Sequence, residues 1–171
     1  MANRYYLDEK RYPRTGNCVF VSYHYRDREA AKQIANYISH SGVDIYFDEY
    51  NIQIGYGDLK KSVEHIKAGI RRSSHMLCVI SQTALKSHLM PWEIGYGYDL
   101  LKVVGLTVKE LSKSELPEYL QVVPVLRGTK TLNSFIANTI GRVADSLIRE
   151  QKILSALQMN HPLNNILDWQ L

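Results

Sequence analysis

Short apolar runs alternate along the chain with stretches in which apolar residues recur every three or four positions. The runs are rich in β-branched and aromatic residues, as is typical of strands covered on both faces of a parallel sheet. Five runs predict strands: 18–23 (CVFVSY), 43–47 (VDIYF), 76–81 (MLCVIS), 103–107 and 122–126 (VVPVL). Pro124 inside the last run predicts a short strand at the edge of the sheet.

The periodic stretches predict helices between these strands. Asp27 is placed to cap the first helix, and Ser41 with Gly42 supplies its stop signal. The expected helices lie between Asp27 and Ser41, between Leu59 and Ile70, between about Pro91 and Leu101, and from 131–134 to as far as 157. Pro91 marks the start of the third helix, because proline is tolerated in a first helical turn.

Strands that alternate with helices need crossover connections, which predict an open parallel sheet with helices on both faces. We expect one domain over residues 17–158, with an N-terminal extension over 1–16 and a C-terminal tail over 159–171. The 171 residues are enough to bury a continuous core without metal or disulfide. Trp169 and Leu171 suggest that the tail docks on the core or on a neighbouring molecule.

The composition, 45% apolar and 22% charged with a net charge of +4, is that of an ordinary globular protein. Its N-terminus is polar, unlike a signal peptide, and no apolar stretch is long enough to cross a bilayer. Cys18 and Cys78 lie in apolar runs, where buried reduced thiols are common. We therefore expect a cytoplasmic protein with no membrane partner.

Other common kinds of site have little support in the sequence. The basic residues Lys60, Lys61, Arg71 and Arg72 share one predicted helix and its end, where a solvated face is expected and not a nucleic acid site. Histidines and cysteines are not grouped at metal-ligand spacing, so no metal is expected. The GYG triplets at 55–57 and 95–97 mimic part of a dinucleotide-binding motif, but neither follows the first strand. We therefore expect no bound cofactor.

Ligands of such sheets bind beyond the carboxyl ends of the strands. The segments to inspect are therefore 23–27, 48–58, 81–93 and the stretch after Thr107. They hold a mixture of carboxylates, hydroxyls, aromatic rings and one arginine, which could together bind a sugar, a phosphate or a ring. Acidic residues in loops are also often merely solvated.

Three segments in order resemble the boxes of the TIR (Toll/interleukin-1 receptor) domain family, over roughly residues 17–150. VFVSYHYRD at 19–27 is similar to the family's first strand and polar loop, and VDIYFDEYNIQIG at 43–55 to its second strand and BB loop. SQTALKSHLMPWEIGYG at 81–97 is similar to its third strand and the helix that holds an acidic residue. The resemblance implies a flavodoxin-like three-layer sandwich.

Enzymatic TIR domains break the nicotinamide–ribose bond of NAD, and the resemblance implies that Glu93 is the catalytic residue. A carboxylate against the ribose stabilises the positive charge of an oxocarbenium-like transition state. The alternative is that Glu93 is an ordinary acid in a first helical turn, where the helix dipole favours it. One feature departs from the family: Leu89 stands where enzymatic members often have Trp, and Trp92 directly precedes Glu93.

The resemblance also implies a set of substrate-binding residues, with NAD as substrate and not as cofactor. These are Ser22, Tyr23, His24, Arg26, Phe47, Asp48, Ser81 and Trp92. Arg26 suits a pyrophosphate, although it could instead pair with Asp27. Asp48 could orient a ribose and Trp92 could stack on a ring, whereas their structural alternatives are a solvated acid and a core aromatic.

Stand-alone TIR proteins of this size resemble those of bacterial Thoeris antiphage defence. That resemblance implies a cyclic or conjugated ADP-ribose-derived messenger, a separately encoded effector that reads it, and self-association through the BB loop at about 48–58. The main alternative is a non-enzymatic TIR adaptor. A receiver domain would need acids where Ser22 and Ser81 stand, and a nucleoside deoxyribosyltransferase-like enzyme fits the three boxes less well.

Overall fold

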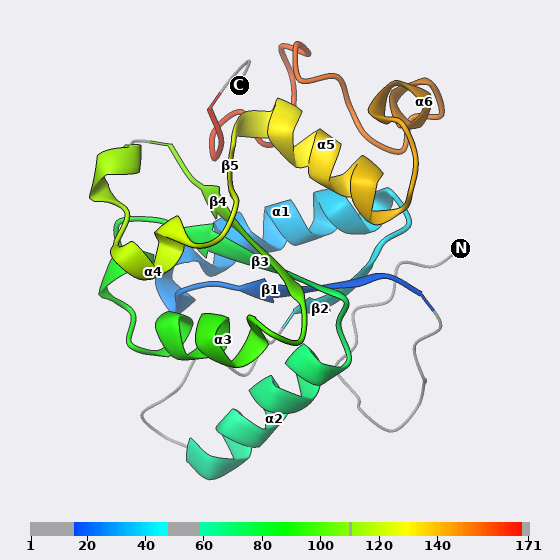
Figure 1. Ribbon diagram of the computed structural model, residues 1–171. Helices are drawn as coiled ribbons and strands as arrows, with labels where there is room; N and C mark the ends of the chain where they lie inside the picture. The colour runs from blue at the N-terminus through cyan, green and yellow to red at the C-terminus, as the bar shows by residue number, and fades with distance from the viewer. Residues whose placement is uncertain (1–15, 48–58, 110, 169–171) are drawn as a thin grey trace.

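Five parallel strands form one sheet in the computed structural model, which describes residues 16–47, 59–109 and 111–168 (Figure 1). They are β1 (Cys18–Ser22), β2 (Asp44–Phe47), β3 (His75–Ile80), β4 (Lys102–Thr107) and β5 (Val125–Arg127). Their spatial order is β2-β1-β3-β4-β5. This order confirms the predicted flavodoxin-like sheet and places the reversal of strand order at β1 and β3, where ligands of open α/β sheets bind.

The last strand lies at the edge of the sheet, as Pro124 predicts. It begins only after this proline, because proline has no N–H to give to a neighbouring strand. The Pro124 carbonyl still accepts a hydrogen bond from the Gly105 amide of β4, at 2.8 Å. The strand is therefore shorter than the apolar run 122–126 suggests, and it extends instead to Arg127.

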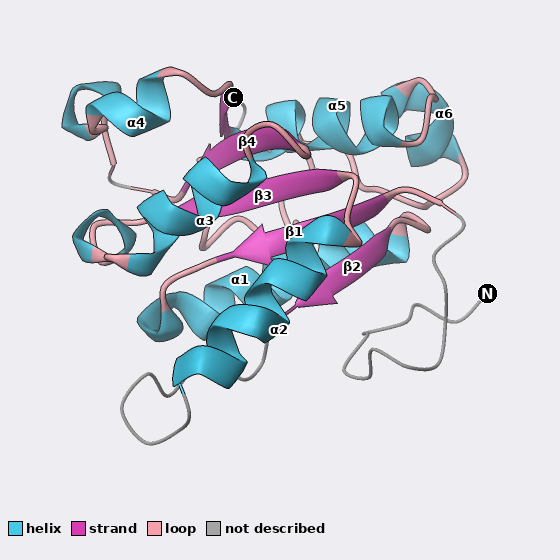
Figure 2. Cartoon of the chain, turned by 60° about the horizontal axis from the view of Figure 1, so that its bottom comes forward, coloured by secondary structure: helices cyan, strands magenta, loops and turns pink. Residues whose placement is uncertain are grey.

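Helices cover both faces of the sheet (Figures 1 and 2). One face carries α1 (Arg28–His40) and α5 (Gly128–Thr139), with α6 (Ala144–Arg149) beside α5, and the other carries α2 (Leu59–Arg71), α3 (Leu89–Gly97) and α4 (Glu118–Gln121). The short 3-10 helices η1 (Tyr25–Asp27), η3 (Ala84–Lys86) and η4 (Lys113–Glu115) lie in the loops. None of the helices in the described part of the chain is long and apolar enough to span a membrane.

The sheet separates two hydrophobic clusters. The α1/α5-side cluster includes Val19, Val21, Tyr23, Ile34, Ile38, Ile45, Phe47, Leu77, Val79, Leu132, Ile136, Leu163 and Leu167. The α2/α3-side cluster includes Cys18, Phe20, Tyr46, Ile66, Ile70, Met76, Cys78, Ile80, Met90, Ile94 and Leu120. Because side chains alternate along each strand, neighbouring residues of one strand belong to different clusters. Cys18 and Cys78 are both buried thiols, as predicted.

Helix α3 begins before its expected start at Pro91 and ends before Leu101. The Ser87 hydroxyl accepts hydrogen bonds from the amides of Leu89 and Met90, each at 3.2 Å, and so satisfies the first turn two residues earlier. The helix ends at Gly97, whose carbonyl accepts from the amides of Leu100 and Leu101 in a closing turn. The acidic residue Glu93 therefore lies in the middle of this helix.

The expected single long helix from 131–134 toward 157 is wrong. The chain forms two helices, α5 and α6, that are separated at Gly141. Gly141 has a φ of +67°, a left-handed conformation that ends helices and that glycine adopts without strain. The apolar spacing continues through the break because the second helix also buries Leu147 on the same cluster.

The C-terminal tail packs on the α1/α5-side cluster as far as it is described. Leu163 and Leu167 are fully buried, and the His161 ring lies 5.0 Å from the Tyr37 ring. The Lys109 amide donates to the Ile166 carbonyl at 2.9 Å, and Arg127 pairs with Asp168 at 2.9 Å. Residues 161–168 are thus part of the core; Trp169 and Leu171 lie outside the described residues.

Two buried histidines should make the folded state sensitive to acid. Burial lowers the pKa of His161, and burial together with nearby Lys102 lowers the pKa of His75. Both rings regain their ordinary pKa of 6.5 on unfolding, so the unfolded state binds more protons below that pH. The contribution of these two histidines to the free energy of unfolding should be fully present well above pH 6.5 and should fall as the pH is lowered through 6.5 toward the folded pKa values.

Chemical denaturation at pH 7.5 and 5.5 measures this difference. In the variant His161→Asn the asparagine Oδ1 can still accept from the Leu163 amide, as Nδ1 of His161 does at 3.1 Å. Its loss of stability between the two pH values should therefore be smaller than that of the unchanged chain. An equal loss in both proteins would show that His161 does not contribute to the pH dependence.

Gly69 in α2 is required by the close approach of Tyr46. A Cβ added at Gly69 would lie 2.6 Å from Cζ of the Tyr46 ring, which is buried and stacks on Phe20. We expect Gly69→Ala to lower the free energy of unfolding by about 1–3 kcal/mol through this overpacking, even though alanine favours helix over glycine by about 1 kcal/mol.

Gly95→Ala is the matched control. Gly95 is also helical, but a Cβ there meets no atom within 4 Å. This substitution should therefore show the propensity gain alone and raise stability by about 0.5–1 kcal/mol. Urea denaturation of the two variants should move the midpoints in opposite directions, and a shift of both in the same direction would refute the steric explanation.

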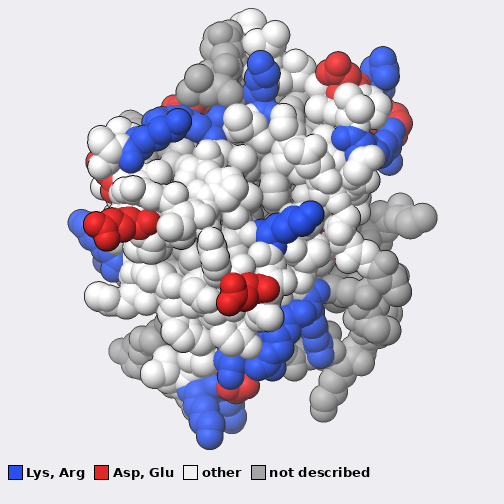
Figure 3. Space-filling view, in the orientation of Figure 1, with Lys and Arg blue, Asp and Glu red and all other residues white. Residues whose placement is uncertain are grey.

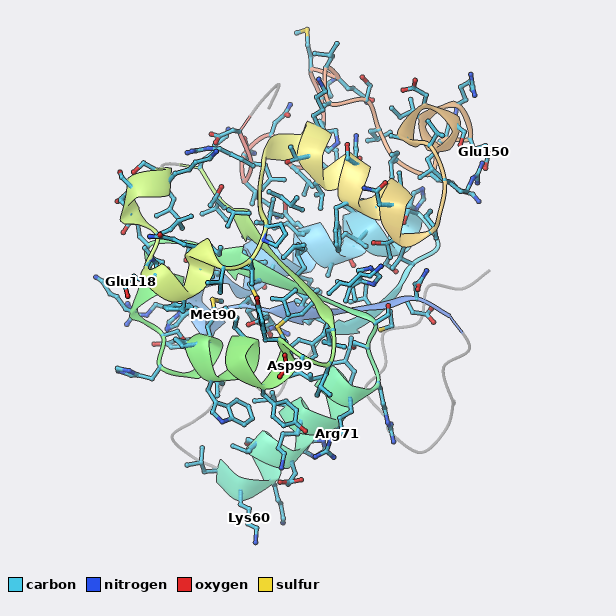
Figure 4. All side chains as sticks on the ribbon, in the orientation of Figure 1. Lys60, Arg71, Met90, Asp99, Glu118 and Glu150 are labelled. Atoms are coloured by element: carbon cyan, nitrogen blue, oxygen red, sulfur yellow. The ribbon has the colours of Figure 1, made fainter. Side chains whose placement is uncertain are left out.

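Basic side chains gather over α2, as predicted (Figure 3). They are Lys60, Lys61, Lys67, Arg71 and, just beyond the helix, Arg72. Lys60 and Arg71, labelled in Figure 4, lie at its two ends. The helix is amphipathic, with Ile66 and Ile70 buried against the sheet and the cations on the outer side.

Candidate functional site

The predicted catalytic carboxylate lies against the end of β1. Helix α3 directs Glu93 inward, where it is only 1% exposed, and the Ser22 hydroxyl donates a short hydrogen bond to its Oε2. Ser22 is the last residue of β1 and is itself buried. The structure therefore brings Glu93 and Ser22 together at the carboxyl edge of the sheet, where β1 meets β3.

Cys78 is the third member of this buried group, and it was not among the predicted site residues. It is the register partner of Ser22 in the parallel pairing of β1 with β3. Burial raises the pKa of the Cys78 thiol, the nearby Glu93 carboxylate raises it further, and a hydrogen bond with Ser22 lowers it. Cys78 therefore remains a neutral thiol beside Glu93, in surroundings from which water is excluded.

Tyr23 and Phe47 lie on the other face of the sheet. Their rings are stacked, with centroids 4.7 Å apart and planes 12° apart, and both are buried in the α1/α5-side cluster. Tyr23 directly follows Ser22, and Phe47 is the last residue of β2. The side chains of both point away from the face that carries Glu93. The structure thus does not bring these two predicted contacts to the carboxylate.

His24 and Arg26 follow β1 in an exposed loop. The Arg26 side chain donates from Nε to the Tyr25 hydroxyl at 3.0 Å, and its guanidinium lies 5.6 Å from the centre of the Tyr25 ring. Nδ1 of His24 accepts from the Arg26 amide at 3.3 Å. Arg26 thus interacts with Tyr25 and not with Asp27. Both residues lie just beyond the carboxyl end of β1.

Asp27 occupies the N-cap position of α1, as predicted, but its side chain makes no cap hydrogen bond. Its carboxylate instead accepts from the hydroxyls of Ser81 and Thr83, in the loop that follows β3. Ser81, a predicted substrate contact, is buried in this interaction. The contact between the two loops therefore replaces a hydrogen bond to the start of α1. No pattern in the sequence predicts this contact.

Trp92 lies on the outer side of α3, apart from Glu93. It is 38% exposed and stacks on Tyr96, with ring centroids 5.6 Å apart. The Tyr96 hydroxyl accepts from Nε of Arg71 at 2.7 Å, and Lys67 lies 5.8 Å from the same ring. Because successive residues of a helix point in directions about 100° apart, the structure assigns Trp92 to the surface shared with the cations of α2.

Asp48 and the predicted BB loop at 48–58 lie outside the described residues. Within 16–47, 59–109 and 111–168, no three His, Cys, Asp or Glu side chains are grouped so that they could hold a metal ion. The chemical groups assembled at the edge of the sheet are therefore one buried carboxylate, a hydroxyl that donates to it and a neutral thiol.

Comparison with known proteins agrees with this architecture. A family model described as a TIR domain matches residues 19–134, a range that includes Ser22, Cys78 and Glu93. A metazoan TIR-STING receptor from C. gigas, solved in complex with 2',3'-cGAMP, is similar in structure, with a TM-score of 0.53 and 18% identity over 84% of this chain. The match spans only 41% of that receptor chain, so the likeness concerns one part of it.

A diflavin flavoprotein A3 from Nostoc sp. also matches, with 13% identity and a TM-score of 0.43 over 81% of this chain and 97% of its own. A search of curated proteins gave no match.

Proposed function

The chain belongs to the TIR domain family, and from that premise we propose that it cleaves the nicotinamide–ribose bond of NAD, with Glu93 as the catalytic residue. The observation that carries the proposal is the burial of Glu93 at the ligand-binding edge of the sheet, with Ser22 donating to its carboxylate. A buried carboxylate is costly, and such groups occur preferentially at functional sites.

In the proposed reaction, the bond from the ribose anomeric carbon to the nicotinamide nitrogen breaks, and its electron pair leaves with nicotinamide. The pyridinium nitrogen becomes neutral on leaving, so no general acid is needed. Positive charge develops on the ribose ring, where the Glu93 carboxylate stabilises it in a medium of low dielectric constant. The hydrogen bond from Ser22 fixes the orientation of the carboxylate.

The neutral state of Cys78 suits this mechanism. A thiolate next to the ribosyl cation would capture it and alkylate the enzyme, since the thiolate and not the thiol is the nucleophile. The raised pKa of Cys78 keeps its sulfur protonated. The cation is then captured by water or by another nucleophile, which loses its proton to solvent. Water gives linear ADP-ribose, whereas a nucleophile within the substrate or a second small molecule gives a cyclic or conjugated product.

The proposal extends to a signalling role. A cyclic or conjugated ADP-ribose derivative, read by a separately encoded effector, would serve bacterial antiphage defence of the Thoeris kind. Glu93 is almost fully buried in the single chain, so a substrate needs a conformation that opens the site. Self-association through residues 48–58, which lie outside the described residues, would supply that conformation, and the isolated chain would then show little activity.

The same burial favours a second candidate, a TIR–TIR interaction module without enzymatic activity. A carboxylate that no substrate reaches is compatible with a domain that only binds other TIR domains. The exposed Trp92, stacked on Tyr96 and flanked by the cations of α2, offers such a domain a contact surface. The two candidates differ in whether NAD is consumed.

Chromatography with mass spectrometry of NAD incubated with concentrated protein, with and without lysate of infected cells, separates them. Release of nicotinamide supports the enzyme, and the mass of the co-product distinguishes hydrolysis, cyclisation and transfer. Folded protein that consumes no NAD under any of these conditions would exclude the enzyme and leave the interaction module.

A further inference from the structure

Asp27 joins the two loops that border the Glu93 site. It ends η1 in the loop that follows β1, and its carboxylate reaches across to the loop after β3. There Oδ2 accepts from the Ser81 hydroxyl, while Oγ1 of Thr83 lies 3.2 and 3.3 Å from the two carboxylate oxygens. Hydrogen bonds from hydroxyls to an ionised carboxylate are among the stronger ones in proteins.

Contacts within the loop after β3 hold the Ser81 side chain in place. The Ser81 oxygen accepts from the Ala84 amide at 2.9 Å, in the first turn of η3, and lies 3.1 Å from Oγ1 of Thr83. Asp27 is in turn held by its own amide, which donates to the His24 carbonyl at 2.8 Å. We call the group Asp27, Ser81, Thr83 and Ala84 the loop clasp.

The loop clasp connects the two segments of the chain that carry Ser22 and Glu93. Ser22, which donates to Glu93, ends β1 five residues before Asp27, and the clasped loop leads from β3 into α3, which carries Glu93. Asp27 also lies at the N-terminus of the 13-residue helix α1, where the helix dipole favours its negative charge. Its side chain makes no cap hydrogen bond, so both carboxylate oxygens remain available to the other loop.

We propose that Asp27 is a positioning residue that holds the β1 and β3 loops together and so fixes the start of α3, and with it Glu93, against Ser22. Ser81 serves the clasp in this arrangement: its oxygen is engaged by Asp27, Thr83 and Ala84. The structural part of the proposal stands by itself, and its effect on catalysis rests on the proposed function.

The test compares Asp27→Ala, Asp27→Asn and Ser81→Ala with the matched control Glu29→Ala. Glu29 lies on the same first turn of α1, but its side chain is 79% exposed and its nearest cation, Arg28, is 3.7 Å away. Asp27→Ala and Glu29→Ala each remove one acid from the same end of α1, and of these two only Asp27→Ala removes the loop clasp. Hydrogen exchange of the peptide covering residues 82–93 reads the effect without any need for activity.

Exchange in this peptide should be about tenfold faster in Asp27→Ala than in the unchanged chain, because a local opening reaction loses its strongest hydrogen bonds. Asp27→Asn, which retains one acceptor oxygen, should lie between them. Adding Ser81→Ala to Asp27→Ala should accelerate exchange by less than the sum of the two single effects, since the two residues share one contact and mainly the bond from the Ala84 amide to Ser81 is left to lose. Equal exchange in Asp27→Ala and Glu29→Ala would overturn the proposal.

Kinetics of nicotinamide release then test the link to the site. Loss of positioning should lower kcat about tenfold with little change in KM, because a misplaced carboxylate weakens only the transition state. Faster exchange with an unchanged kcat would refute the positioning role. If the unchanged chain proves inactive, the proposed function fails, while the exchange data still decide whether the clasp holds the start of α3.

Discussion

Glu93→Gln is expected to lower the rate of nicotinamide release by a factor of about 10²–10³, the size of effect seen when one group that stabilises transition-state charge is removed. Glutamine has nearly the shape of glutamate, and its carbonyl oxygen can still accept from the Ser22 hydroxyl. The variant therefore removes the negative charge and leaves the contact. Initial rates at several NAD concentrations, followed by chromatography, give the measurement.

The same substitution should raise the free energy of unfolding by about 1–3 kcal/mol, because a buried carboxylate loses more hydration than a buried amide. A fall in activity together with a rise in stability cannot be produced by misfolding. Glu118→Gln is the matched control, since Glu118 is an exposed residue of α4 and should change neither quantity. Full activity in Glu93→Gln would remove Glu93 from the mechanism.

Truncation after Asn160 is expected to abolish folding. It removes the fully buried Leu163 and Leu167, the buried His161 and the ion pair between Arg127 and Asp168. Loss of each buried leucine costs about 2–5 kcal/mol, and the total stability of a domain is only about 5–15 kcal/mol. Circular dichroism and thermal unfolding of the truncated chain should therefore show no cooperative transition.

Two point substitutions test the same packing if the truncated chain cannot be purified. Leu163→Ala should lower the free energy of unfolding by about 2–5 kcal/mol. Leu157→Ala, at a position that is 65% exposed just before the tail, should change it by less than about 0.5 kcal/mol. A truncated chain that melts at the temperature of the full chain would show that the tail packing does not contribute to stability.

The sheet could be predicted from the sequence because each strand is a buried apolar run, and such runs differ plainly from the helical stripes between them. The helix boundaries were predicted less well. The Ser87 hydroxyl accepts from the first amides of α3, ahead of Pro91, and Gly141 divides the last helix although the apolar spacing continues across it. In both places one residue with a strong local preference decides the boundary, and a pattern averaged over many residues does not detect it.

The site was predicted in part. The resemblance to the family located Glu93, but its contact with Ser22 and the presence of Cys78 depend on the register between strands that are far apart in the sequence. Alternation along β1 did carry a usable signal. It puts Tyr23 on the opposite face from Ser22, and the same reasoning separates Phe47 from the carboxylate.

The partition of the core by the sheet has a consequence for how the protein can change over generations. Residues 161–168 strengthen the cluster opposite Glu93, without contributing side chains to the group that holds the carboxylate. Substitutions that improve packing there raise the stability margin of the whole domain and leave the surroundings of Glu93 unchanged. A lineage with such a margin can accept destabilising changes on the face that carries α2 and α3. The tail side is thus the part of the fold that makes the other side free to evolve.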